Sequence, residues 1–322
     1  MRFGIIGTGR VTRRLVADLQ STAGVQVTAI ASRSASRAAW CSGEYGIARA
    51  FEGYQSLLDS DLIDAVYVAL PPSLHATWSI AAARAGKHIL CEKPLAMSLE
   101  EANGIAAAAS AAGVRWLDAT AWLHHPRTVA MREAVADGQI GELRHISAAV
   151  SFFEPFQDNE HRLDHSLGGG CLLDLAWYGA SAAIAAAGPV RRAFTDAKRR
   201  EGIIFRATAL LWFDHDVTAT IHCGYDTATR KWMEWAGDQA SIVCDDFTRP
   251  WAERPPRIWI HNRAGKVESH QFSGSQERWM IEALVDGRDL GQFQTQALRT
   301  QAAIDAMNRS ATSGQIEPLS CE

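Results

Sequence analysis

The chain has 322 residues, of which 47% are hydrophobic and 21% are charged, and its formal net charge is -4 at pH 7. This composition excludes a wholly disordered chain, and the mild acidity excludes a bulk electrostatic drive toward nucleic acid or an anionic membrane. At roughly 150 residues per domain, the length predicts about two domains.

The six cysteines are scattered along the chain without Cys-x-x-Cys pairs. This spacing favours reduced thiols over disulfide staples or a zinc site, and we therefore expect a cytoplasmic protein without a metal. No apolar run approaches the roughly 18 residues that span a bilayer. Because Met1–Gly4 leads directly into a structured motif, we also expect no signal peptide.

Short apolar runs alternate with helical stretches over the first part of the chain. The predicted strands lie at 3–6, 25–31, 63–70, 88–91 and 115–119. Apolar residues in the stretches between them recur at helical spacing. Strands that alternate with helices are typical of a parallel, doubly wound sheet.

The pattern changes after residue 121. A long apolar strand is predicted at 143–153, and a helix at 172–187 follows a glycine triplet. Residues 190–272 have the pattern of consecutive strands with short polar turns, which favours an antiparallel sheet. We therefore predict an α/β protein with two domains, 1–121 and 122–322.

A glycine-rich turn joins the first predicted strand to the first helix. Its residues are Gly7, Thr8, Gly9, Arg10 and Val11. Gly7 permits the tight turn, and Gly9 lets the backbone approach a pyrophosphate at the helix N-terminus, where free N–H groups favour anions. The third position of the motif is Thr12 instead of Gly or Ala. An ordinary glycine turn is the alternative, but the position inside a β-α-β unit favours a dinucleotide site.

The end of the second strand, Ser32-Arg33-Ser34, predicts which cofactor binds. An NAD site usually has Asp or Glu here to bond the ribose 2′-hydroxyl. In this chain no carboxylate is present to repel a 2′-phosphate, the serines can donate hydrogen bonds, and Arg33 can pair with the phosphate or stack on adenine. We therefore predict NADP(H) in preference to NAD(H); the alternative is that Arg33 is a solvated turn residue.

Two further segments carry the candidate chemistry. Glu92-Lys93-Pro94 follows a short predicted strand, so Lys93 lies beyond a carboxyl strand end, where doubly wound sheets bind ligands. Asp174 and Tyr178 follow the glycine triplet, and their spacing of four places them on one helix face among apolar residues. The alternatives are a solvated Lys93 and a buried Asp–Tyr pair with only a structural role.

These motifs, in this order and spacing, resemble those of the glucose–fructose oxidoreductase/inositol dehydrogenase (Gfo/Idh/MocA) family. The resemblance covers nearly the whole chain. It implies an NADP-binding Rossmann domain, and a substrate-binding and oligomerisation α+β domain with a large open, mainly antiparallel sheet. It also implies a homodimer or homotetramer formed through that sheet, and hydride transfer between nicotinamide and a sugar-like or cyclic alcohol or ketone. Tyr at position 178 resembles the branch with glucose–fructose oxidoreductase and dimeric dihydrodiol dehydrogenase, whereas the inositol dehydrogenases have His.

The resemblance implies roles for individual residues. Tyr178 is expected to act as the acid/base, Lys93 to stabilise charge on the substrate oxygen, and Asp174 to orient the pair. A free tyrosine has a pKa of about 10, so Tyr178 needs a nearby cation to act as a base near neutrality. The further cofactor contacts implied are Leu70, Pro71, Pro72, His75 and Glu92. The substrate contacts implied are Trp122, His124, His125, Asn159 and Arg162. The Lys93–Pro94 bond is also expected to be cis.

The chain departs from the family pattern at Leu123, where the family usually has Arg, so His124 or His125 is expected to line the pocket instead. Within enzymes, the alternatives are a dihydrodiol dehydrogenase and a nucleotide-sugar ketoreductase. The latter needs a basic groove, for which Arg191, Arg192, Lys198, Arg199 and Arg200 are candidates. An alternative of another class is a non-catalytic regulator that senses NAD(P) and a sugar, but the intact Lys93, Asp174 and Tyr178 favour an enzyme.

Overall fold

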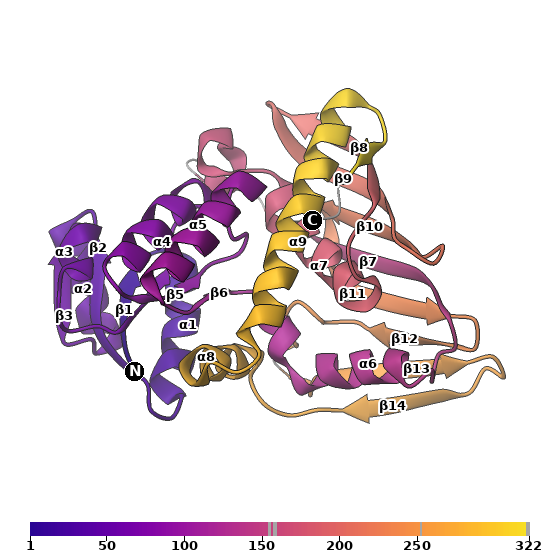
Figure 1. Cartoon of the computed structure of the whole chain (residues 1–322), viewed down its shortest axis with the longest axis horizontal. Helices are drawn as coiled ribbons and strands as arrows, with labels where there is room; N and C mark the ends of the chain where they lie inside the picture. The colour runs from indigo at the N-terminus through magenta and orange to yellow at the C-terminus, as the bar shows by residue number, and fades with distance from the viewer. Residues whose placement is uncertain (154–155, 157–159, 252, 320–322) are drawn as a thin grey trace. The chain divides into compact units, whose positions relative to one another are not determined.

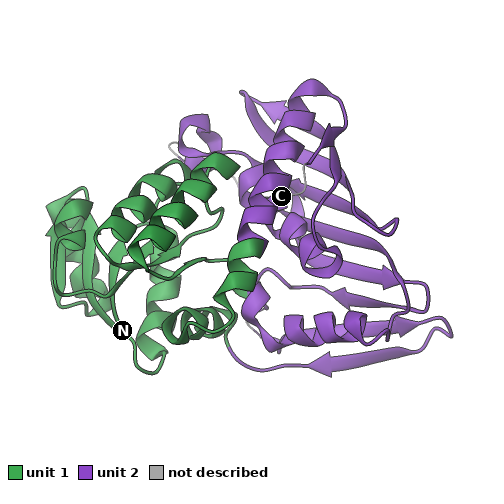
Figure 2. Cartoon of the chain, in the orientation of Figure 1, with its two compact units in different colours: residues 1–121, 275–295 green, residues 122–274, 296–322 purple. Residues whose placement is uncertain are grey.

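The computed structural model describes residues 1–153, 156, 160–251 and 253–319. The chain divides into two compact units (Figure 2). The first comprises Met1–Ala121 and Ser275–Thr295, and the second comprises Trp122–Gly274 and Gln296–Glu322. The first unit thus combines the N-terminal residues with a segment from late in the chain.

The first unit is built on a six-stranded sheet in the order β3-β2-β1-β4-β5-β6 (Figure 1). Every neighbouring pair of its strands is parallel, which confirms the predicted doubly wound sheet. Its strands are β1 (Arg2–Ile6), β2 (Gln26–Ser32), β3 (Arg49–Glu52), β4 (Ala65–Val68), β5 (His88–Cys91) and β6 (Trp116–Asp118). The strand order reverses between β1 and β4, and such sheets bind ligands beyond the carboxyl strand ends at this point.

Helices connect and cover the strands of the first unit. They are α1 (Arg10–Ser21), α2 (Ala35–Tyr45), α3 (Tyr54–Leu58), α4 (His75–Arg84), α5 (Leu99–Ala112) and α8 (Gln276–Asp286). Helix α8 packs against α1. Its residues Met280, Ile281 and Leu284 are buried in the same hydrophobic core as Phe3 and Leu19. Burial of this apolar face of α8 explains why the segment Ser275–Thr295 belongs to the first unit.

The second unit contains a nine-stranded sheet in the order β14-β13-β12-β11-β7-β10-β9-β8-β15. Its strands are β7 (Leu143–Phe153), β8 (Arg192–Arg200), β9 (Ile203–Trp212), β10 (Thr218–Gly224), β11 (Asp226–Gly237), β12 (Ala240–Cys244), β13 (Arg257–Asn262), β14 (Val267–Gln271) and β15 (Glu317–Pro318). Strands β7 and β10 are parallel. The other pairs described are antiparallel, which confirms a large, mainly antiparallel sheet.

The two faces of this sheet differ. Helix α7 (Trp177–Ala187) packs on β7 and β10, and Gly179 allows the close approach because a Cβ there would lie 2.6 Å from Ile221 Cγ2. The opposite face carries partly exposed Trp212, Trp232 and Trp259 on three strands of the sheet. Helices α6 (Pro126–Ala136) and α9 (Leu290–Ser313) complete the described helices longer than five residues.

One helical segment among the described residues, His165–Ala187, is long and apolar enough to cross a membrane by length and composition. However, 67% of its most apolar stretch is buried inside the protein. Since α7 lies in this segment and packs on the sheet, its apolar character is that of a core helix.

Candidate functional site

In the first unit, the predicted cofactor segments lie at one edge of the sheet. The glycine-rich turn follows β1, the segment 32–34 ends β2, residues 70–72 follow β4, and Lys93 follows β5. Because these strands are parallel, their carboxyl ends share one edge, and the four segments are brought together there.

The glycine-rich turn has the geometry that its sequence predicts. Gly7 has a φ of 109°, and a Cβ there would lie 2.2 Å from Ala69 O, so only glycine fits. Gly9 caps helix α1, and a Cβ on it would meet nothing within 4 Å. The buried Thr12 donates from Oγ1 to Gly7 O at 3.2 Å, so the third motif position closes the turn through its hydroxyl. The space beside Gly9, at the N-terminus of α1, suits a phosphate group.

The turn between β2 and α2 presents two exposed arginines. Arg33 lies near Tyr54, whose pKa is raised by burial against the opposing effect of the guanidinium charge. Arg37 donates from Nη2 to Thr8 O at 3.3 Å and stacks over Trp40 with 5.1 Å between its Cζ and the ring centroid. Arg37 was not identified from the sequence. The signal that could have identified it is its position three residues after the helix cap Ser34. The Oγ of Ser34 accepts a hydrogen bond from Arg37 N.

Lys93 is held through its backbone by its neighbour Glu92. Lys93 N donates to Glu92 Oε2 at 3.2 Å, and Tyr67 donates from its hydroxyl to Glu92 Oε1 at 2.5 Å. Burial raises the pKa of Glu92, while the hydrogen bond from Tyr67 and the charge of Lys93 oppose that increase. The Lys93–Pro94 bond is cis.

His75, the first residue of α4, is fully buried. Its Nδ1 lies 2.7 Å from Pro94 O and its Nε2 lies 2.8 Å from Leu70 O. The side chain therefore joins the segment after β4 to the segment after β5. Pro72, three residues before His75, is buried, whereas Leu70 and Pro71 are half-buried.

In the second unit, the glycine triplet packs against the loop before it. Gly170 N donates to Arg162 O at 3.0 Å, Gly169 N donates to Asp164 O at 2.8 Å, and a Cβ on Gly169 would lie 2.7 Å from Arg162 O. The helix expected from residue 172 begins with a π-helical turn, Leu172–Ala176, and becomes α-helical at Trp177. π-Helical turns are rare in proteins, and many of those that occur lie at functional sites.

Asp174 lies in this π-helical turn and binds two side chains. Arg162 donates from Nε to Asp174 Oδ2 at 2.7 Å, and Tyr225 donates from its hydroxyl to the same oxygen at 3.2 Å. Burial alone would lower the pKa of Arg162, but the carboxylate of Asp174 raises it above its ordinary value. Burial, together with Asp174, raises the pKa of Tyr225 well above the ordinary value. Tyr225 was not identified from the sequence, because only the fold brings the end of β10 to this turn.

Tyr178 lies in the first turn of α7, and its ring packs edge-on against Phe247 with 6.4 Å between centroids. Phe247 packs in the same way against Trp122 at 5.3 Å, and both of these side chains are fully buried. The loop that carries Phe247 is fixed by Arg127, which donates from Nη1 to Asp246 Oδ1 at 2.6 Å and from Nη2 to Phe247 O at 3.2 Å.

The other predicted substrate contacts are placed as follows. Burial lowers the pKa of His124 to about 3 and that of His125 to about 4, so both are neutral at pH 7. His125 accepts through Nδ1 from Arg127 N at 3.1 Å and caps helix α6. Leu123 is buried beside them in the chain. Asn159 lies outside the described residues.

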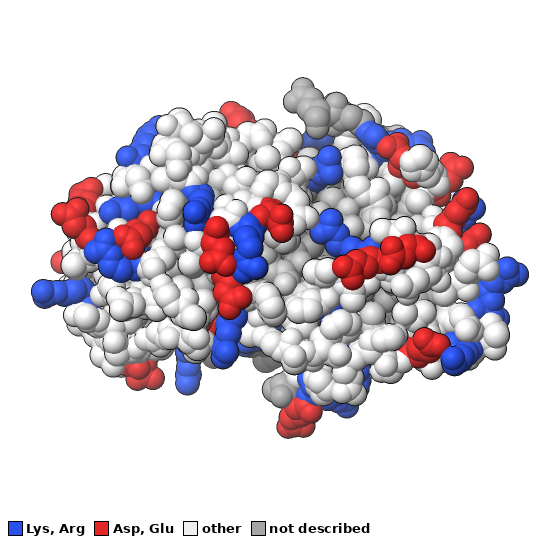
Figure 3. Space-filling model, turned by 60° about the horizontal axis from the view of Figure 1, so that its bottom comes forward, with Lys and Arg blue, Asp and Glu red and all other residues white. Residues whose placement is uncertain are grey.

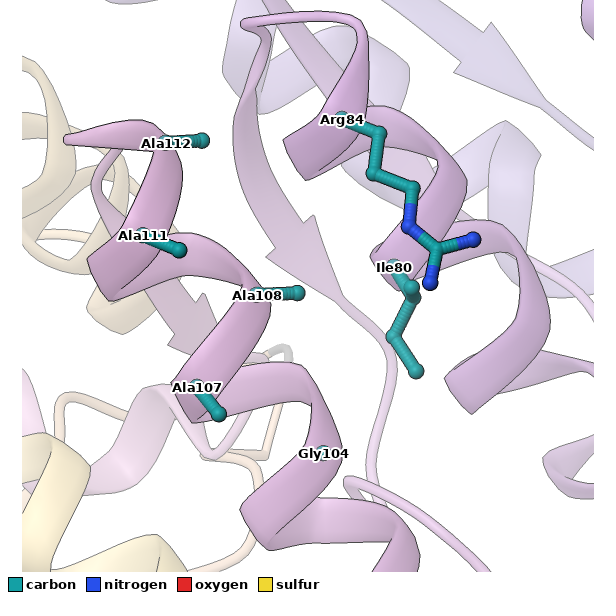
Figure 4. Close-up of a pocket in the computed structure, with 7 residues that line it drawn as sticks. All are labelled: Ile80, Arg84, Gly104, Ala107, Ala108, Ala111 and Ala112. Atoms are coloured by element: carbon teal, nitrogen blue, oxygen red, sulfur yellow. The ribbon is translucent and has the colours of Figure 1, made fainter.

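No group of three or more His, Cys, Asp or Glu side chains among the described residues could hold a metal ion. Cys171 and Cys223 are buried thiols whose sulfur atoms lie 3.4 Å apart. A hollow of about 580 Å³ lies between α4 and α5 (Figure 4). Its lining consists of Ile80, Arg84, Gly104, Ala107, Ala108, Ala111 and Ala112, and it includes none of the predicted site residues.

Comparison with known proteins gives matches along both units. Residues 1–119 match the oxidoreductase family with an NAD-binding Rossmann fold, and residues 128–245 match the GFO/IDH/MocA C-terminal domain. The chain is 34% identical to an oxidoreductase of Rhizobium meliloti over 99% of both chains. It is 35% identical to dTDP-3,4-didehydro-2,6-dideoxy-α-D-glucose 3-reductase of Streptomyces antibioticus, over 82% of this chain and 81% of the relative.

A crystal structure of a 3-ketoreductase from Actinomadura kijaniata, in complex with NADP and TDP-benzene, has a similar fold. The TM-score is 0.88 at 29% sequence identity, and the match covers 96% of this chain and 97% of that enzyme. Solved structures of that enzyme include a variant with a tyrosine replaced by phenylalanine, and variants with a lysine replaced by glutamate or alanine.

Proposed function

Because the chain belongs to the Gfo/Idh/MocA family of oxidoreductases, we propose that it transfers hydride between NADP(H) and a sugar-like or cyclic alcohol or ketone. The observation that carries this proposal is the set of segments at the carboxyl edge of the first unit's sheet. There the glycine-rich turn and the two arginines suit the cofactor's phosphates, and Lys93 follows the neighbouring strand β5.

The cofactor we propose is NADP(H). The D-xylose 1-dehydrogenase of Haloferax volcanii and the scyllo-inositol 2-dehydrogenase of Bacillus subtilis are both named as NADP(+) enzymes. The open space beside Gly9 suits the pyrophosphate, and Arg33 and Arg37 offer two exposed cations for the 2′-phosphate. When bound, the reduced cofactor supplies the hydride.

In the proposed reduction, Tyr178 donates a proton to the ketone oxygen while the carbonyl carbon accepts hydride, so that the product is an alcohol. Lys93 stabilises the negative charge that develops on that oxygen, and it favours the tyrosinate that the reverse reaction needs. Asp174 is a positioning residue in this scheme. Its carboxylate is held by Arg162 and Tyr225, and it fixes the turn that leads to Tyr178.

A nucleotide-sugar 3-ketoreductase is the second candidate function. It is supported by four relatives named as dTDP-sugar 3-reductases, at 29–35% identity. Most of the basic residues considered for a diphosphate groove already have contacts in the second unit. Arg191 pairs with Asp214, and Arg192 and Arg200 stack over Trp212 and Phe205. We therefore rank this candidate second.

The test is a substrate screen that follows NADPH absorbance with ketoses, inososes, keto-dTDP-sugars and their alcohols. Turnover of a free sugar or polyol supports the first candidate, and turnover confined to dTDP-sugars supports the second. If NADPH binds but neither class turns over, the chain is a sensor and the proposal is wrong.

We also propose a cytoplasmic homodimer or homotetramer that associates through the face of the second unit's sheet that carries Trp212, Trp232 and Trp259. Partly exposed aromatic side chains of this kind are enriched at protein interfaces. On the face shown in Figure 3, acidic and basic side chains are interspersed. That distribution gives no reason to propose a nucleic-acid or membrane partner.

A further inference from the structure

His75 is a buried histidine whose two ring nitrogens both lie close to backbone carbonyl oxygens. Its ring nitrogens lie 2.7 Å from Pro94 O and 2.8 Å from Leu70 O, and the side chain has no solvent exposure. Pro94 follows Lys93 directly, and Leu70 belongs to the segment after β4. The ring therefore lies between two segments that are expected to contact the cofactor.

The number of protons on the ring follows from these partners. A carbonyl oxygen can only accept, and a neutral imidazole has one N–H and one lone pair. In the neutral ring, one nitrogen lone pair would face a carbonyl lone pair at under 3 Å, away from water, which is repulsive. A doubly protonated ring donates to both oxygens, and distances of 2.7 and 2.8 Å lie within the range of charge-assisted hydrogen bonds.

Two other histidines of the chain show the contrasting arrangement. His88 Nδ1 accepts from Arg115 N at 3.0 Å, and His125 Nδ1 accepts from Arg127 N at 3.1 Å. A ring nitrogen that accepts a hydrogen bond carries no proton, so both of these rings are neutral. His88 lies in the same unit as His75 and provides an internal reference.

We propose that His75 is an imidazolium clamp that positions the backbone on either side of Lys93, by binding Pro94 O and Leu70 O at once. The clamp acts on the reaction through Lys93, and this inference therefore rests on the proposed function. With the clamp in place, the segment after β5 is held from two sides, by His75 at Pro94 and by Glu92 at Lys93 N. A displacement of a catalytic group by about 1 Å can cost 100-fold in rate.

The charged groups around the clamp lie on the loop after β5 and on the elements packed against α4. Glu92 lies two residues before Pro94 and is half-buried. The elements packed against α4 are α3, α5, β4, β5 and the turn at 72–74. The titratable and charged groups on these elements, on α4 itself and on the loop after β5 are Tyr54, Tyr67, Arg84, His88, Cys91, Glu92, Lys93, Glu100 and Glu101.

The first test measures the protonation of His75 directly, in the unmodified chain labelled with ¹⁵N-histidine at pH 7. Both ring nitrogens of His75 are expected to show the chemical shifts of protonated nitrogens, whereas His88 shows one protonated and one unprotonated nitrogen. The His75→Gln variant assigns the signals. A His75 ring with one unprotonated nitrogen overturns the proposal, whether or not the protein proves to be an oxidoreductase.

The second test measures kinetics in His75→Phe, which keeps the ring volume but removes both hydrogen bonds. We expect kcat to fall roughly 10- to 100-fold, with a smaller fall in His75→Gln and with the Kd of NADPH changed less than kcat. Ser79→Ala, one turn further along α4, removes a buried hydroxyl from the same helix and serves as the control. If kcat in His75→Phe stays within two-fold of the unmodified chain, the clamp has no role in positioning Lys93. If the unmodified chain has no turnover at all, the proposed function fails and the NMR result alone decides the protonation.

Discussion

At the scale of single residues, Lys93 and Tyr178 are the groups proposed to carry the chemistry. Tyr178→Phe removes the proton donor and Lys93→Met removes the charge that stabilises the substrate oxygen. Each variant is expected to lower kcat by roughly 100- to 10,000-fold while the Kd of NADPH changes little. Steady-state kinetics together with a fluorescence titration of NADPH measure both quantities. Near-normal kcat in either variant would refute the assignment.

Asp118, at the end of β6, carries a prediction about pH. Burial raises its pKa to about 6, against the opposing hydrogen bond from Thr120. An unfolded Asp titrates near pH 4, so between about pH 4 and pH 6 the folded chain retains a proton that the unfolded chain has lost. The free energy of unfolding therefore falls as the pH rises through this window, and the loss is complete above about pH 6.

In Asp118→Asn the side chain cannot ionise, so the unfolding free energy should not fall in this pH window. We expect the variant and the unmodified chain to be equally stable at pH 4, and the variant to be more stable by up to about 3 kcal/mol at pH 7. Denaturant unfolding at the two pH values gives the difference, with Asp61→Asn as a solvent-exposed control. A stability difference that is the same at both pH values would contradict the assignment.

At the scale of structural elements, the turn between β2 and α2 is the segment that we propose sets the cofactor preference. Arg37→Ala removes one of the two cations proposed for the 2′-phosphate. We expect the ratio of NADPH affinity to NADH affinity to fall roughly 10-fold or more, because a hydrogen bond to a charged group contributes about 1.5–3 kcal/mol. Arg84→Ala is the control, because the last turn of α4 lies at the opposite edge of the sheet. An equal loss of affinity for both cofactors would show that Arg37 does not bind the 2′-phosphate.

The loop that carries Phe247 depends on the buried ion pair between Arg127 and Asp246, whose side chains are 0% and 1% exposed. Arg127→Met leaves the carboxylate of Asp246 buried without its cation and should cost about 3–5 kcal/mol of unfolding free energy. Adding Asp246→Leu removes the orphaned charge, so the double variant should recover much of that loss. Denaturant unfolding of both variants tests this, and a loss below 1 kcal/mol in Arg127→Met would mean that the pair contributes little.

At the scale of the whole molecule, local patterns predicted the parallel sheet of the first unit because its strands and helices alternate in short units. The antiparallel sheet followed from strand runs with short turns. The place of α8 beside Phe3 and Leu19 was not predicted, because nothing local in residues 275–295 indicates which core they join.

In the candidate site, too, local sequence predicted some features but did not show which distant segments meet. The turn at Gly7 and the position of Lys93 follow from motif and strand order. Tyr225 was missed because its partner Asp174 is far away in the sequence. Arg37 has a local signal in its place after the cap Ser34, but its contact with Thr8 O is visible only in the fold. The π-helical turn at Asp174 was also not predicted, because periodicity does not distinguish it from an α-helical turn.

The central claim is that this chain moves hydride between NADP(H) and a sugar-like ketone or alcohol. The most direct test incubates the unmodified chain with NADPH that carries two deuterium atoms at C4 of the nicotinamide, together with the panel of ketones. Mass spectrometry of the sugar products gives the readout. The expected product is an alcohol that contains one deuterium. The unmodified chain should form it, and Tyr178→Phe should form much less of it. Bound cofactor with no deuterated product from any ketone would contradict the central claim.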